Sequence, residues 1–212
     1  MHISIVDIGI NNSRSIERAF RNQLESIDTL SILEIPNSDF NSSDLIVIPG
    51  VGNFGVAMGN LRKVGFHDQI KAAGNAGRKI VGICLGMQLL FESSEESPGV
   101  DGLGLIRGSC KKLTSSISPR VPHVGWNGVN PEYPNSHFGA LYENKDFYFA
   151  HSFHANPIDN SNILSVTNLE NANIVSSVLH QNILGFQFHP EKSGNTGKRL
   201  LNEVLVWARN EN

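Results

Sequence analysis

The most informative ten residues of this sequence are Val81-Gly82-Ile83-Cys84-Leu85-Gly86-Met87-Gln88-Leu89-Leu90. Residues 80–83 form an apolar run typical of a buried strand, and residues 85–91 have the apolar content of a helix. Cys84 stands at the junction inside Gly-x-Cys-x-Gly, which is the nucleophile-elbow pattern with cysteine in place of serine. The pattern predicts a strained turn that lifts the sulfur above a sheet edge, where the positive end of the helix favours a thiolate. A cysteine is also a common small core residue, so the pattern alone leaves both interpretations open.

The bulk properties of the chain narrow its class. It has 212 residues, of which 40% are hydrophobic, and a net charge of -3. This length suits a single domain over residues 1–212. Neither a basic stripe nor a polyanionic tail is present, so a nucleic-acid partner is not expected. The first residues lack signal-peptide character and no run reaches membrane-spanning length, so we expect no membrane association and a cytoplasmic location.

The sequence contains two cysteines, Cys84 and Cys110, and their spacing matches neither a disulfide framework nor a zinc site. We therefore expect no metal and no cofactor. A reducing compartment suits a protein that must keep a thiol reduced. Cys110 lacks turn residues around it, which indicates a structural role.

The first half of the chain alternates strands and helices. Residues 3–6, 29–34 and 44–49 are apolar runs, and uniformly apolar strands are typical of a parallel sheet that helices cover on both faces. Ser13 is the expected N-cap of a helix whose apolar face holds Ile16, Ala19, Phe20 and Leu24. A second helix over residues 65–77 ends at glycine.

A glycine-rich segment, Pro49-Gly50-Val51-Gly52-Asn53-Phe54-Gly55, directly follows the third strand. In open α/β sheets, ligands bind at the carboxyl ends of the strands, and bare backbone there can approach a ligand closely. A flexible connection to the next helix is the simpler alternative. A phosphate-binding loop is disfavoured because the Lys-Ser/Thr pair of a P-loop is absent.

The second half of the chain contains consecutive strands with no helices between them. We predict strands over residues 105–110, 146–150, 163–167, 174–179 and 183–188, surface loops over residues 92–104 and 115–122, and a closing helix over residues 193–210. Residues 123–127 are ambiguous between strand and loop. The expected fold class is α/β, an open mixed, mostly parallel sheet with helices on both faces and a C-terminal antiparallel extension.

A second motif, which could supply the base for the elbow cysteine, is Gln187-Phe188-His189-Pro190-Glu191-Lys192-Ser193. A cysteine nucleophile needs a base, and the imidazole needs a partner that holds its tautomer. Cys84, His189 and Glu191 supply both functions, following the logic of the serine triad. A lone His-x-Glu is more often a surface histidine beside a helix-start glutamate, but its combination with the elbow and the glycine loop favours catalysis.

Three separated stretches resemble the triad-type, class I glutamine amidotransferases: Pro49-Gly50-Val51-Gly52, residues 82–88 and Phe188-His189-Pro190-Glu191. Residues 122–127, 148–153 and 185–194 narrow the resemblance to the glutaminase subunits of imidazole glycerol phosphate synthases, which act in histidine biosynthesis. The resemblance covers the chain from Asp7 to the last helix.

The resemblance implies hydrolysis of L-glutamine by Cys84, His189 and Glu191. The elbow supplies one oxyanion donor, the N–H of Leu85, and the loop at Val51 and Gly52 is expected to supply the other. By resemblance, Gly52, Gln88 and Ser152 hold glutamine. The implied partner is a (β/α)8-barrel cyclase subunit in a heterodimer, and the expected docking residues are Asn12, Trp126, Tyr148 and Lys192. Core packing of the two aromatics and simple solvation of the lysine are the alternatives.

The sequence departs from the family pattern at two places, so the molecule that accepts the ammonia could differ from that of the family. The first turn reads Asp7-Ile8-Gly9-Ile10-Asn11-Asn12 where the family usually has Asp-Tyr-Gly-x-Gly-Asn, and Phe153, followed by His154, replaces a usual tyrosine. A paralogue that feeds ammonia to the amidation of a surface-polysaccharide sugar is one alternative. A catalytically inactive scaffold is another, although the intact triad argues against it.

Overall fold

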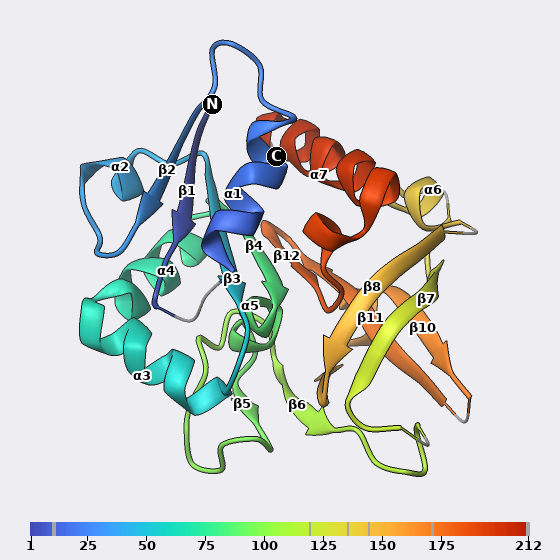
Figure 1. The fold of residues 1–212 in the computed structure, drawn as a ribbon. Helices are drawn as coiled ribbons and strands as arrows, with labels where there is room; N and C mark the ends of the chain where they lie inside the picture. The colour runs from blue at the N-terminus through green and yellow to red at the C-terminus, as the bar shows by residue number, and fades with distance from the viewer. Residues whose placement is uncertain (10–11, 119, 135, 144, 171, 211–212) are drawn as a thin grey trace.

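The computed structural model describes residues 1–9, 12–118, 120–134, 136–143, 145–170 and 172–210 (Figure 1). Its main sheet has nine strands in the order β2-β1-β3-β4-β12-β11-β10-β7-β8. The pairings from β2 to β12 are parallel and those from β12 to β8 are antiparallel. The strands are β1 (His2–Val6), β2 (Thr29–Leu33), β3 (Leu45–Gly50), β4 (Lys79–Cys84), β7 (His123–Pro131), β8 (Lys145–His151), β10 (Ile163–Leu169), β11 (Ala172–His180) and β12 (Ile183–Phe186).

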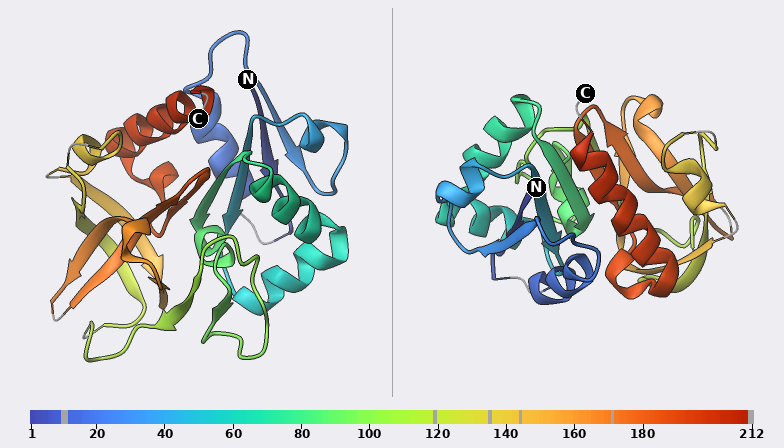
Figure 2. Two further views of the ribbon diagram at one scale, coloured as in Figure 1. Left: turned by 180° about the vertical axis from the view of Figure 1, so that it is seen from behind. Right: turned by 90° about the horizontal axis from the view of Figure 1, so that it is seen from above.

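Helices cover both faces of the parallel half, as predicted (Figure 2). Along β3, Leu45 and Val47 belong to one core cluster, whereas Ile46 and Ile48 belong to the other. This two-residue alternation buries the strand on both faces, because successive side chains point to opposite sides of a sheet. The first cluster packs under α1 (Ser13–Arg21) and α7 (Gly194–Arg209), and the second under α3 (Phe54–Val64), α4 (Phe66–Asn75) and α5 (Leu85–Leu89).

A smaller three-stranded sheet lies beside the antiparallel half. Its order is β5-β6-β9, formed by β5 (Ser93–Ser94), β6 (Gly108–Lys112) and β9 (Phe153–Pro157). The sequence prediction missed β9, placed β6 three residues too early, and missed two single-turn helices, α2 (Ser38–Asn41) and α6 (Gly139–Tyr142). Such short elements carry too few residues for a periodic signal. The ambiguous residues 123–127 are part of strand β7.

The surface loop predicted over residues 92–104 was wrong in part. Leu103 is fully buried, and its N–H bonds the carbonyl of Leu89 at 2.9 Å. The N–H groups of Leu105 and Ile106 both bond the carbonyl of Leu90, at 2.9 and 3.0 Å. The last carbonyls of a helix have no hydrogen-bond partners within the helix. The N–H groups of this segment supply the missing donors at the end of α5. The helix α5 ends at Leu89, earlier than the predicted stop by residues 93–94.

The N-terminal boundary of α1 also differs from the prediction. Asn12 occupies the cap position without a side-chain cap hydrogen bond, and Ser13 is the first helical residue. The hydroxyl of Ser13 instead donates to the carboxylate of Asp7 at 2.6 Å. Leu24 lies beyond the end of the helix at Arg21, although it still packs against the core. The predicted turn includes Ile10 and Asn11, which lie outside the described residues.

Candidate active site

Cys84 is the last residue of β4 and immediately precedes α5, as the elbow pattern predicts. Its backbone has φ 55° and ψ -111°, a conformation that costs energy for a residue with a side chain. A Cβ at Gly86 would collide with the carbonyl of Ile48, and one at Gly82 would lie 2.6 Å from the backbone of Gly86 and Met87. Both glycines are therefore required for the turn to pack against β3 and α5.

His189 and Glu191 lie beyond the end of β12, the strand next to β4. The N–H of His189 bonds the carbonyl of Tyr148 at 2.8 Å, which attaches this segment to β8. His189 Nδ1 lies 2.8 Å from Glu191 Oε1, and both side chains are buried. Pro190 begins the 3₁₀ turn η2 (Pro190–Lys192) that separates the two residues. The carboxylate therefore fixes the imidazole orientation.

The His189 side chain also interacts with the Cys84 sulfur, and this interaction affects the pKa of the imidazole. Burial lowers the pKa of His189, but its hydrogen bonds with the Cys84 sulfur and the Glu191 carboxylate outweigh that effect and raise the pKa to about 10. The imidazole is therefore a cation at neutral pH, in contact with the sulfur and the carboxylate. The two groups that lie 105 positions apart in the sequence meet at one edge of the sheet.

The sulfur opens into a cavity of about 300 Å³. Cys84 is only 5% exposed and belongs to a core cluster, but it also lines this cavity. The predicted oxyanion and glutamine-binding residues line the same cavity: Val51, Gly52, Leu85, Gln88 and Ser152. Gly52 has φ +105°, a backbone conformation that favours glycine. The structure thus brings together residues that the sequence analysis grouped from three separate motifs.

Gln88 is held at its amide nitrogen. Nε2 donates to the carbonyl of Phe153 at 2.9 Å and to Gln187 Oε1 at 3.1 Å. Because both N–H groups are engaged, Oε1 is the atom of this side chain that can accept a bond from a ligand. Gln187 is fully buried, and its Nε2 lies 3.9 Å from the Cys84 sulfur.

The sequence analysis missed Glu96 as a cavity residue. Its carboxylate lines the cavity and accepts a hydrogen bond from the N–H of Phe54 at 2.6 Å, at the first turn of α3. A negative charge in the cavity that Cys84 also lines suits a cationic group on a ligand. Glu96 lies in the acidic segment of residues 92–104, where nothing in the sequence distinguishes it from Glu92 or Glu95.

The four expected docking residues surround the buried end of the triad. Trp126 is 55% exposed, so it is not a core residue. Its ring meets Tyr148 edge-on with centroids 6.0 Å apart, and Lys192 Nζ lies 5.7 Å above the Tyr148 ring. Asn12 has an additional contact that the sequence did not suggest, because its Nδ2 donates to Glu191 Oε1 at 2.5 Å. These residues form one surface beside His189.

The described residues contain neither a metal-binding cluster nor a membrane-spanning helix. No group of three or more histidine, cysteine, aspartate or glutamate side chains there is arranged to hold a metal ion. None of the helices in that part of the chain combines the length and apolar character that a bilayer span requires.

Residues 4–207 match the sequence model of the glutamine amidotransferase class-I family. Among curated relatives, the imidazole glycerol phosphate synthase subunit HisH of Pyrococcus furiosus is 45% identical over 199 residues, covering 94% of this chain and 95% of the relative. The subunit of the same name from Thermotoga maritima is 40% identical over 207 residues, covering 97% and 96%. Among solved structures, a glutamine amidotransferase superposes with a TM-score of 0.74 at 16% identity, covering 97% of this chain and 98% of the other. PurLQS from Thermotoga maritima superposes with a TM-score of 0.72 at 20% identity, covering 98% and 99%.

Proposed function

The chain belongs to the class I glutamine amidotransferases, and on that premise we propose that it is the glutaminase subunit of an imidazole glycerol phosphate synthase. In this role residues 1–212 form one domain that hydrolyses L-glutamine to glutamate and ammonia. The ammonia passes to a cyclase subunit that makes imidazole glycerol phosphate in histidine biosynthesis. The observation that carries the proposal is 45% identity to a subunit of that name, over nearly the full length of both chains.

The proposed reaction begins with the Cys84 thiolate attacking the side-chain amide carbon of glutamine. The His189 imidazolium donates its proton to the departing nitrogen, which leaves as ammonia, and a glutamyl thioester remains. His189 then takes a proton from water, which attacks the thioester and releases glutamate and the thiolate. Glu191 holds the imidazole in position and stabilises its cationic form.

Each tetrahedral intermediate carries an oxyanion that requires hydrogen-bond donors. We assign one to the N–H of Leu85, which follows the nucleophile, and the other to the loop at Val51 and Gly52. One such donor contributes about 3 kcal/mol to the transition state. The orientation of this loop could therefore change turnover by about two orders of magnitude.

Glutamine binding is assigned to cavity residues of complementary chemistry. The free Oε1 of Gln88, the backbone of Gly52 and the Ser152 segment suit the polar groups of the amino acid. The Glu96 carboxylate suits its ammonium group. No cofactor enters this scheme, because the thiol, imidazole and water carry every step.

The proposed partner is a (β/α)8-barrel cyclase that docks on Asn12, Trp126, Tyr148 and Lys192 and forms a heterodimer. An exposed tryptophan beside a tyrosine and a lysine has the composition of an interface hot spot. Because free ammonia is mostly protonated at neutral pH and then is a poor nucleophile, direct transfer to the partner is an advantage. Cyclisation in the partner would give the complex its lyase activity, and we place it in the cytoplasm, where thiols stay reduced.

The experiment is to purify this chain with the partners that it captures from its own cell extract and to assay glutamate release. We expect a cyclase barrel to co-purify and glutamine turnover in that complex to disappear in Cys84→Ala. Capture of a sugar amidotransferase together with a barrel relative would instead support the polysaccharide pathway. Absence of turnover in every complex would leave only the scaffold interpretation.

A further inference from the structure

A chain of hydrogen bonds connects strand β7 with the cavity. It begins at the side-chain amide of Asn127, whose Oδ1 lies 2.7 Å from His123 Nε2. His123 Nδ1 lies 2.9 Å from His151 Nε2, and His151 Nδ1 lies 2.8 Å from the carbonyl oxygen of Phe153. His123 and His151 are 7% and 6% exposed, so water offers them few alternative partners.

The chemistry of the final acceptor sets the direction of every bond in this chain. A carbonyl oxygen only accepts, so His151 Nδ1 must carry the proton. Burial lowers the pKa of His151 to about 3, despite the opposing bond to Phe153, so the ring is neutral at pH 7 and Nε2 is unprotonated. His123 Nδ1 must then be the donor to it.

The same reasoning continues to Asn127. Burial also lowers the pKa of His123, so its Nε2 is unprotonated and needs a donor. The structure places Asn127 Oδ1 at this position, so the inference requires a half-turn of the amide that exchanges its oxygen and nitrogen and presents the NH₂ group to Nε2. All donors in the chain point from β7 toward Phe153.

The Phe153 carbonyl also receives the bond from Gln88 Nε2 at 2.9 Å. A carbonyl oxygen has two lone pairs, and here one is used by His151 and the other by Gln88. The second N–H of Gln88 reaches Gln187, whose own Nε2 lies 3.9 Å from the nucleophile. The position of this carbonyl thus sets the position of a proposed glutamine-binding side chain.

We propose that His123 and His151 are positioning residues that fix the Phe153 carbonyl and thereby Gln88, so that glutamine affinity depends on the placement of strand β7. This inference rests on the proposed glutaminase function. Strand β7 also carries Trp126, the exposed aromatic residue next to Asn127 in the proposed docking surface. A partner that shifts β7 would therefore change the affinity of the cavity for glutamine through the three hydrogen bonds that lead from His123 to Gln88.

The first test compares three variants in the complex with the cyclase subunit. His123→Phe keeps an aromatic ring against Phe149, whose centroid lies 4.9 Å away, but removes the donor and the acceptor. We expect the KM for glutamine to rise about tenfold, the equivalent of one lost hydrogen bond, with kcat within about threefold of wild type. His123→Gln retains a donor and an acceptor and should recover most of the affinity.

The matched control is His180→Phe. His180 Nδ1 lies 3.0 Å from Asn162 Oδ1, so this pair has the same chemistry as His123 and Asn127, but it lies at the end of β11 and lines no part of the cavity. Its loss should leave the KM unchanged. An unchanged KM in His123→Phe, with wild-type turnover intact, would overturn the inference. Absence of turnover in the wild-type complex would instead refute the proposed function.

The second test does not require activity. Nitrogen-15 NMR of histidine-labelled full-length chain reports which ring nitrogen is protonated. At pH 7 we expect His123 and His151 both to be neutral with the proton on Nδ1, each signal being assigned by its loss in the corresponding phenylalanine variant. A proton on Nε2 of His151 would contradict the direction of the chain and overturn the inference, even where a variant folds too poorly for kinetics.

Discussion

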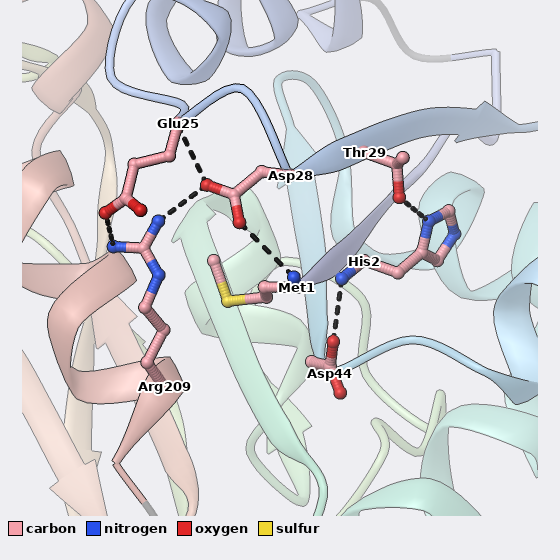
Figure 3. A network of polar contacts seen from close by, with 7 residues as sticks. All are labelled: Met1, His2, Glu25, Asp28, Thr29, Asp44 and Arg209. Carbon is pink, nitrogen blue, oxygen red and sulfur yellow. Dashed lines mark hydrogen bonds and ion pairs between the residues drawn. The ribbon is translucent and has the colours of Figure 1, made fainter.

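Each edge of the parallel sheet contains a buried carboxylate, and the two carboxylates differ in their hydrogen-bond and ion-pair partners. At the amino-terminal edge, Asp28 accepts bonds from the N–H of Glu25 at 3.0 Å and from Arg209 at 2.5 Å, and pairs with the Met1 amine at 3.3 Å (Figure 3). At the carboxyl edge, both His189 and Asn12 bond the same Glu191 oxygen. One oxygen of each carboxylate, Glu191 Oε2 and Asp28 Oδ1, is buried with no hydrogen-bond partner among the described residues, but only the Asp28 oxygen has a cation, the Met1 amine, as an ion-pair partner.

This difference separates stability from function. Three donors around Asp28, two of them cationic, compensate its burial and hold α7 against the start of β1 and β2. Glu191 has fewer donors and faces a group whose charge changes during the proposed reaction. A carboxylate with fewer donors can respond to that change, whereas one that is held by two cations fixes the structure.

Cavity size does not distinguish the two edges. The amino-terminal edge has the larger cleft, about 530 Å³ against about 300 Å³ for the cavity at Cys84. Its arginines are engaged: Arg78 donates to the carbonyls of Phe40 and Asn41, and Arg209 pairs with Asp28. The smaller cavity instead combines a strained nucleophile with a neighbouring imidazole. The arrangement of reactive groups therefore locates the site better than volume does.

The largest effect that we predict comes from the cysteine at the carboxyl edge. Cys84→Ala should reduce glutamate release by the complex at least 10⁴-fold, because it removes the proposed nucleophile, while leaving the free energy of unfolding almost unchanged. Cys110→Ala is the matched control, since Cys110 is a fully buried thiol whose pKa burial raises. It should lower stability by about 1–2 kcal/mol and retain turnover. Equal loss of activity in both variants would contradict this separation.

The next effect tests the carboxylate of the triad. Glu191→Gln keeps the side-chain shape but removes the charge that orients and stabilises the His189 cation. We expect kcat to fall about 10³- to 10⁴-fold, as for the corresponding change in serine triads, together with a lower urea midpoint at pH 7, because the same charge stabilises the buried His189 cation. Steady-state kinetics and urea unfolding of the same preparation would measure both. A large loss of stability with normal kcat would mean that Glu191 is a structural residue like Asp28.

The reciprocal substitution at the amino-terminal edge should show the opposite pattern. Asp28→Asn weakens the contacts with Arg209 and the Met1 amine, and we expect it to lower the free energy of unfolding by about 1–2 kcal/mol. Because Asp28 lies at the edge opposite Cys84, kcat and KM should remain at wild-type values. A change in KM larger than threefold would show that the two edges are coupled.

The smallest effect is the pH dependence of stability, which should have opposite signs at the two edges. Three donors around Asp28 outweigh the opposing effect of its burial and lower its pKa, so its contribution is present above its unfolded pKa, about 3.9, and is lost as pH falls through the lower folded value. The pKa of His189 is raised to about 10, so its contribution is complete below about pH 6.5 and is lost as pH rises toward 10.

Urea midpoints at pH 3, 5, 7 and 10 would measure both contributions. The difference between wild type and Asp28→Asn should shrink from pH 5 to pH 3, whereas the difference between wild type and His189→Gln should shrink from pH 7 to pH 10. Differences that stay constant with pH would contradict the assignments.

Much of the carboxyl edge could be predicted from the sequence, because its residues lie in contiguous motifs with a physical requirement. The elbow needs Gly82 and Gly86 for steric reasons, and the apolar strands need burial on both faces. The triad followed from the motifs, whereas the glutamine-binding residues Gly52, Gln88 and Ser152 followed from the family resemblance. The sequence could not show that the Asn12 side chain contacts Glu191, because 179 positions separate them and no local pattern connects them.

The errors share a physical cause. Residues 92–104 are acidic and rich in glycine and proline, so their composition indicates a solvent-exposed loop, yet their backbone serves another element. Glu96 and the pair His123 and His151 depend in the same way on contacts across strands. The local composition of a segment predicts whether it is exposed to solvent. It does not predict which distant backbone groups the segment forms hydrogen bonds with.

The contacts between residues 103–106 and α5 have a consequence for protein engineering. The turn that carries Cys84 leads into a single short helix, α5, whose final carbonyls are capped by a segment 14 to 16 residues downstream. A graft of residues 80–91 onto another scaffold would leave those carbonyls bare and let the turn fray. The transferable unit is residues 80–106, so any transplanted cysteine nucleophile of this kind must bring the downstream segment with it.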